Sequence, residues 1–140
     1  MNNRIEEMIS AYVEEKDFYG ETTEEQIVKT EGFLGFKFPK EYREFVKMYG
    51  SGGICGVQIA GIEGDLGASV IKATERWRRL GLDKSIVVIE DVGEFIMCMN
   101  TSNNDSKVYV WYRIYPKLVE RYESFTSFLI DNFQEGIDNY

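Results

Sequence analysis

The sequence predicts an α+β fold, a single domain in which a twisted, mainly antiparallel sheet is flanked by N-terminal helices and a C-terminal helix. Hydrophobic residues follow helical spacing up to residue 49 and change to alternation after the glycine-rich corner at 50–53. Four apolar segments between residues 86 and 122 are joined by turns too short for parallel crossovers, which favours antiparallel pairing. With 140 residues, 44% of them hydrophobic, we expect one domain over 1–140.

Two amphipathic or capped helices are predicted before residue 32. Apolar residues recur at helical spacing over residues 4–16: Ile5, Met8, Ile9, Tyr12 and Val13. Thr22 and Thr23 each precede Glu or Gln by three residues, which is typical of a capping box. This predicts a helix from about residue 23 to Glu31, with Ile27 and Glu31 on one face and Gly32 or Gly35 ending it.

Residues 22–53 form the most consistent local pattern, and five of them are assigned structural roles: Glu31, Pro39, Gly50, Gly52 and Gly53. Pro39 suits the first turn of a helix, and Gly50 suits a left-handed cap at its end. No polar side chain precedes Pro39 to cap this helix. We therefore expect the Glu31 carboxylate to lie at its N-terminus, near unpaired amides and the positive end of the dipole.

The remaining elements are predicted in order along the chain. Alternation predicts a strand over 54–62, and helical spacing predicts a helix over 68–80 with Val70, Ile71, Thr74, Trp77 and Leu80 inward. Strands follow at 86–89, 95–99, 108–113 and 118–122, with a polar loop at 100–106. Ser124 is predicted to cap a C-terminal helix with Phe125, Phe128, Leu129 and Phe133 along one side.

Composition argues against several classes of function. The chain has no histidine, which excludes a Ser-His-Asp triad, a Cys-His dyad and any histidine-containing zinc site. We expect Cys55 and Cys98 to be buried free thiols in a reducing compartment. The N-terminus lacks a signal-peptide pattern, and no apolar run is long enough to span a membrane, so a cytoplasmic, non-enzymatic protein without metal or cofactor is expected.

The net charge of −8 is unevenly placed. Residues 1–25 carry eight acids and two bases, or −6, and residues 120–140 carry five acids and one base, or −4. The middle of the chain, with 13 bases and 11 acids, is then close to neutral. Such a negative field repels nucleic acid and attracts a cationic partner. Solvent-exposed helix faces that only keep the protein soluble would give the same distribution of acidic residues.

Two groups of carboxylates at predicted strand ends have more than one interpretation. Glu63 with Asp65, and Glu90 with Asp91 and Glu94, are carboxylates that could serve acid–base chemistry or hold a cation. They could equally be solvated turn residues or contacts for a basic partner. Aromatic residues in 109–115, among them Trp111, belong to types enriched in binding hot spots.

The chain resembles the SUKH superfamily, in particular its Smi/Knr branch, over roughly residues 22–133. The motifs that carry the resemblance are Glu31, Leu34-Gly35, Phe38-Pro39, Tyr42 with Phe45, and Gly52-Gly53. Val88-Ile-Glu-Asp91, an aromatic strand ending near Trp111, and Ser124-Phe-Thr-Ser-Phe-Leu129 follow in the family's order. The chain is also similar to bacterial antitoxins of the YobK kind.

This resemblance implies an immunity protein or antitoxin that binds a cognate toxin domain, of the kind that is often a basic nuclease, in a stoichiometric complex. It implies no catalytic residues. For the partner contact we expect the sheet face and rim that hold Glu63, Asp65, Asp91, Glu94 and Trp111. The alternative is a general protein-interaction adaptor of the Smi/Knr type, without a toxin partner.

Overall fold

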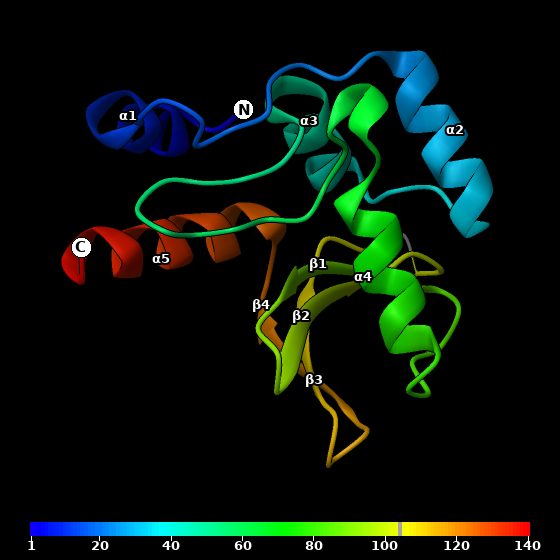
Figure 1. Cartoon of the computed structure of the whole chain (residues 1–140). Helices are drawn as coiled ribbons and strands as arrows, with labels where there is room; N and C mark the ends of the chain where they lie inside the picture. The colour runs from blue at the N-terminus through cyan, green and yellow to red at the C-terminus, as the bar shows by residue number, and fades with distance from the viewer. Residues whose placement is uncertain (104) are drawn as a thin grey trace.

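The computed structural model describes residues 1–103 and 105–140 and has five α-helices and one four-stranded sheet in that part of the chain. The helices are α1 (Asn3–Tyr12), α2 (Glu24–Leu34), α3 (Lys40–Tyr49), α4 (Ser69–Arg78) and α5 (Phe125–Asp138), and a short 3-10 helix, η1 (Gly64–Leu66), precedes α4. The strands are β1 (Ile86–Asp91), β2 (Phe95–Asn100), β3 (Val108–Tyr112) and β4 (Leu118–Tyr122). The predicted α+β class is confirmed (Figure 1).

The sheet is antiparallel throughout, with strand order β1-β2-β3-β4. Alternate residues face two different cores. Val87, Met97 and Val110 join the large core formed with α1, α2, α3 and α5, whereas Val88, Cys98 and Trp111 face a smaller core that α4 closes with Trp77. Both faces of β3 are therefore covered, one by each core.

The outer edge of β1 is covered as well. The Thr74 hydroxyl of α4 accepts a hydrogen bond from the Val88 amide at 3.1 Å, and the Ala60 amide donates to the Ile89 carbonyl at 2.8 Å. These two contacts replace the partners that a further strand would supply. They fix α4 and the preceding loop against the sheet.

The predicted strand over 54–62 is wrong. Cys55 and Gly56 both have positive φ, 50° and 83°, and turn the chain so that the Val57 amide reaches the Ile54 carbonyl. After this turn Ile59 makes only an isolated antiparallel bridge with Gly52. Two successive residues with positive φ break the extended conformation, so the alternating pattern of the sequence cannot propagate as a strand.

The corner after α3 is held by close backbone contacts. A Cβ atom at Gly52 would lie 2.0 Å from the Asp17 carbonyl oxygen, and one at Gly53 would lie 2.6 Å from the Val57 oxygen. Gly50 ends α3 with φ 77° and ψ −72°, so it has positive φ but not the left-handed helical conformation that was predicted. The corner therefore needs glycine chiefly because backbone segments approach closely there.

Glu31 lies at the start of α3, as predicted. It binds the Phe38 amide and Arg43 instead of the unpaired amides of the first helical turn. Its carboxylate accepts a hydrogen bond from the Phe38 amide at 2.7 Å, just before the helix, and binds the Arg43 guanidinium at 3.2 Å. Pro39 is the N-cap residue and supplies no side-chain cap. Glu31 thus connects the end of α2 to the first turns of α3.

Several boundaries differ from the sequence prediction. α1 ends at Tyr12, which leaves Tyr12 and Val13 exposed, and α2 continues through Gly32 to Leu34 before Gly35 ends it. Leu80 follows α4 and points outward, because the helix stops at Arg78. The polar loop predicted at 100–106 includes residue 104, which lies outside the described residues. Among the helices of the described residues, none is long and apolar enough to span a bilayer.

Candidate functional site

The five residues predicted as a partner contact do not form one surface. Glu63 instead caps α4: its two carboxylate oxygens accept hydrogen bonds from the Ser69 amide at 2.8 Å and the Ser69 hydroxyl at 2.6 Å. Ser69 in turn accepts from the Gly61 amide at 2.9 Å. This cap satisfies one orphan amide at the helix start, so a structural role accounts for Glu63.

Asp91 and Trp111 both contact Trp77, but only Trp111 is buried; Asp91 is partly exposed, pairs with Arg76 at 3.5 Å and lines a small hollow together with Glu63. One Asp91 oxygen accepts a hydrogen bond from the Trp77 indole at 2.9 Å, and the other accepts from the Gly93 amide at 3.0 Å. Trp111 packs edge-to-face on Trp77, with ring centroids 5.7 Å apart, and is only 5% exposed. The assignment of Trp111 to an exposed contact surface is therefore corrected, because the second core buries it.

Asp65 and Glu94 are exposed but lie on different elements. Glu94 belongs to the turn between β1 and β2, whereas Asp65 belongs to η1, beside α2 and α4. Of the five predicted residues, only Asp65 lines a largely apolar hollow between α2 and the start of α4.

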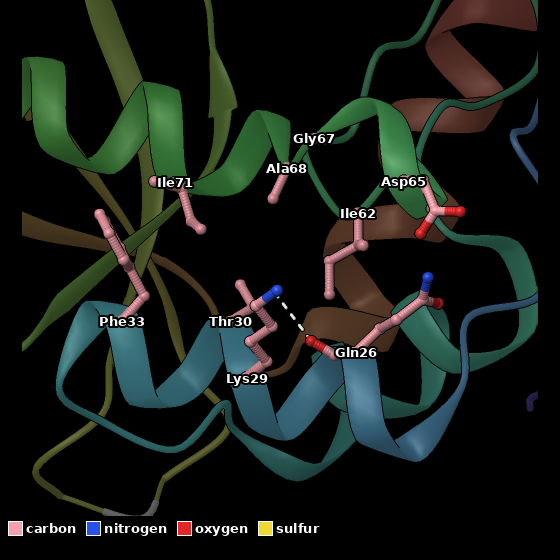
Figure 2. Close-up of a pocket in the computed structure, with 10 residues that line it drawn as sticks. Gln26, Lys29, Thr30, Phe33, Ile62, Asp65, Gly67, Ala68 and Ile71 are labelled. Atoms are coloured by element: carbon pink, nitrogen blue, oxygen red, sulfur yellow. Dashed lines mark hydrogen bonds between the residues drawn. The ribbon is translucent and has the colours of Figure 1, made fainter.

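That hollow, here called the α2–α4 groove, has a volume of about 480 Å³. Figure 2 shows Phe33 and Thr30 rising from α2, Ile71 of α4 and its N-cap Ala68 descending toward them, and Ile62 farther along toward Asp65. Asp65 and Gln26 lie at the end of the groove away from Phe33, and Lys29 lies on the α2 side. A groove with an apolar floor and a few charged groups at its edge is the usual form of a binding site.

Sequence reasoning missed Phe33, the most prominent residue of this groove. The predicted end of the helix at Glu31 placed Phe33 in a spacer, but α2 includes it and leaves it 66% exposed. One signal was available: Phe33 lies four residues after Lys29, on the solvent side of the helical repeat defined by the buried Ile27 and Thr30. A phenylalanine on a polar helix face suggests a contact outside the core.

A second surface feature is an acidic end formed by α1 and α5. These helices pack together, and two side-chain contacts join them and their flanking turns: Arg4 to Gln134 at 3.2 Å, and the Tyr140 hydroxyl to Glu14 at 2.6 Å. Figure 1 shows α1 beside α5, near the C-terminus. Exposed acids of this end are Glu6, Glu7, Glu14, Glu15, Asp131, Glu135 and Asp138.

The acidic end thus unites residues 1–17, with five acids and two bases, and residues 125–140, with three acids and no base, so it carries −6. The other acids of the two terminal segments lie at the start of α2 and on or after β4, where Glu24 pairs with Arg43 and Glu120 with Lys107. Glu90, in a small hollow beside Asn132 and Glu135, belongs to the same region. Burial raises the pKa of Glu90, the Asn132 amide partly offsets this, and the charge of Glu135 raises the pKa further. The region is strongly negative and suited to a cationic partner.

The two thiols and the carboxylates offer little further chemistry. Cys98 is buried in the second core, and burial raises its pKa to about 12. Cys55 is only half-buried, which corrects the expectation of two buried thiols, because it lies in the turn before Val57 rather than in a strand. In residues 1–103 and 105–140, no three Cys, Asp or Glu side chains gather in a way that could hold a metal ion.

Comparison with known proteins agrees with this fold. A crystal structure of a protein from Pseudomonas syringae pv. tomato is 18% identical and superimposes with a TM-score of 0.72, over 89% of this chain and 91% of that chain. At this identity the likeness concerns the fold alone. The family model SUKH_5, described as SMI1-KNR4 cell-wall, matches residues 1–134, so the match includes α1, which the sequence resemblance left out. The chain therefore belongs to the SUKH_5 family, within the SUKH superfamily.

Proposed function

We propose that this protein is a cytoplasmic immunity protein that neutralises a cognate bacterial toxin domain by tight, stoichiometric binding and has no catalytic activity of its own. Membership of the SUKH superfamily supports a protein that acts through a protein partner. The observation that carries the proposal furthest is the acidic end, where α1 and α5 bring together residues 1–17 and 125–140, which hold eight acids and two bases, or a summed charge of −6.

The acidic end favours a basic partner such as a nuclease domain. Nucleases that bind the phosphate backbone carry positive clefts. A negative surface on an inhibitor accelerates encounter with such a cleft and disfavours partners of like charge. The same surface repels nucleic acid, so direct binding of DNA or RNA is not part of the proposal.

Co-expression tests the proposal. The toxin encoded beside this gene is expressed in a sensitive host with and without this protein, and growth is followed. We expect rescue with the wild-type chain and a 1:1 complex in size-exclusion chromatography. Absence of a neighbouring toxin, or failure of rescue when the chain is abundant in the supernatant, overturns the proposal.

A second function, a general interaction adaptor, is supported by the family description, SMI1-KNR4 cell-wall. The two functions differ in the number and strength of partners. An adaptor binds several proteins with micromolar dissociation constants, whereas an immunity protein binds one far more tightly. Quantitative pull-down followed by titration of each captured protein separates the two.

A further inference from the structure

One wall of the α2–α4 groove follows helical spacing. On α2 the lining residues Gln26, Lys29, Thr30 and Phe33 recur every three or four positions, whereas the opposite wall consists of Ile71 of α4, its N-cap Ala68 and the segment 62–67 with η1. Figure 2 shows Phe33 and Thr30 facing Ile71 and Ala68, with Ile62 farther along toward Asp65. Ridges at this spacing are the complement of a third helix, which packs its own i, i+3, i+4 ridges between them.

The groove is apolar where a partner would gain most from burial. Ile62 lies buried at the floor, whereas Phe33 is 66% exposed on the wall. Beyond the other end, Leu66 of η1 is 85% exposed, between the lining residues Asp65 and Gly67. Large apolar side chains that cover no part of their own core mark interaction sites, particularly when they border a hollow.

Charges at the groove edge fix the chemistry of what binds there. Neither Lys29 nor Asp65 makes an ion pair or a side-chain hydrogen bond within the described residues. Asp65 lies at the end remote from Phe33, and Lys29 lies between them on α2 (Figure 2). A partner that binds across the groove therefore meets a negative charge at one end and a positive charge near its middle, which sets the direction of binding.

A helix suits this site better than an extended strand. Strand addition requires an open sheet edge, and the β1 edge nearest α4 already has partners in Thr74 and Ala60. The α2 wall presents its lining residues at helical spacing, and no strand residue lines the groove. An apolar groove of this kind fits the mode of recognition in which an amphipathic helix is laid into it.

We propose that the α2–α4 groove receives an amphipathic helix of the toxin domain, with an apolar side chain between Phe33 and Ile71 and a basic side chain beside Asp65. This inference rests on the proposed function and names the contact surface that the function needs. The groove supplies the apolar anchor, and the acidic end supplies long-range attraction.

The test uses the full-length protein and the purified neighbouring toxin domain, with binding followed by surface plasmon resonance. We expect Phe33→Ala and Asp65→Lys each to raise Kd by about tenfold or more, mainly through faster dissociation. The matched controls are Val28→Ala, an exposed apolar residue of α2 outside the groove, and Glu94→Lys, an exposed acid in the β1–β2 turn. The controls are expected to change Kd by less than about threefold.

The outcomes distinguish this inference from the proposed function. If wild type binds the toxin tightly and both groove variants bind equally well, the groove assignment is overturned and the function stands. If wild type does not bind the toxin, both are overturned. If Phe33→Ala changes the sedimentation coefficient of the free protein, the groove is occupied by a second copy of the chain, which also overturns the assignment to a toxin helix. Urea titration of each variant confirms that it folds.

Discussion

Glu31 shows how one buried carboxylate can hold two helices in place. Its side chain is almost fully buried and is satisfied by the Phe38 amide and by Arg43, which also binds Glu24 at 2.6 Å. The Arg43 side chain is partly exposed, so water is not excluded from the whole network. The carboxylate is therefore a structural group, and its removal leaves both a buried amide and a guanidinium with poorer partners.

Glu31→Gln is expected to destabilise the protein by about 1–3 kcal/mol, because the amide presents donors to the Arg43 guanidinium in place of an acceptor. The free energy of unfolding is measured by urea denaturation. Glu25→Gln, on the exposed side of α2, is the control and is expected to change it by less than about 0.5 kcal/mol. Equal values for the two variants would contradict the assigned role.

Glu90 is expected to make stability fall as pH rises. Because burial raises its pKa above the ordinary value of 4.5, the folded state holds a proton that the unfolded state has already released. The free energy of unfolding therefore decreases from pH 4.5 up to the raised pKa of Glu90. Above that pKa the loss of stability caused by ionising Glu90 is complete. Glu90→Gln should flatten this part of the profile and stabilise the protein at pH 7. An unchanged slope relative to wild type would exclude Glu90 as its source.

The two cysteines should differ in reactivity. Cys98 is fully buried with a pKa of about 12, whereas Cys55 is half-buried in a turn. Since the thiolate is the reactive form, we expect iodoacetamide at pH 8 to label Cys55 first and Cys98 only on unfolding. Peptide mass spectrometry over time measures this. Labelling of Cys98 at the rate of Cys55 in native protein would show that the second core opens readily.

At the scale of elements, the corner after α3 is where backbone contacts decide the fold. Gly52→Ala is expected to cost about 3 kcal/mol or more, because its Cβ atom would meet the Asp17 carbonyl at 2.0 Å in a conformation with φ 106°. Gly56→Ala is the matched control. It also has positive φ but has open space around it, so only the conformational cost of about 1 kcal/mol is expected. Thermal or urea unfolding of both variants measures the difference, and equal losses would mean that sterics at the corner are unimportant.

The elements that the sequence predicted well are those whose signals are local. α3, the four strands and the cap at Ser124 follow from spacing and capping residues within a few positions. The segment 54–62 was mispredicted because positive φ at Cys55, a residue that seldom adopts it, depends on surrounding contacts. The groove could not be predicted, since α2 and α4 are far apart in sequence and only tertiary packing brings Phe33 opposite Ile71.

At the scale of the whole molecule, the acidic end and the α2–α4 groove lie in different places. The counts of acids near each end of the chain were readable from sequence, but their union depends on the packing of α1 on α5. The groove lies between α2 and α4, away from that contact (Figure 1). A basic toxin would therefore be attracted by one region and held by another, which predicts different kinetic effects for changes in each.

Association with the toxin is expected to slow by about tenfold or more between 0.05 and 0.5 M NaCl, because salt screens the acidic end, while dissociation changes by less than about threefold. A double variant, Glu7→Gln with Glu135→Gln, should reduce the association rate at low salt and weaken its dependence on salt. Glu44→Gln with Glu94→Gln changes the net charge equally outside α1 and α5, and should have a smaller effect. Stopped-flow fluorescence measures both rates. If the two double variants slow association equally, net charge rather than the acidic end governs encounter. If the Glu7→Gln, Glu135→Gln variant instead speeds dissociation and the control variant does not, the acidic end is itself a contact surface.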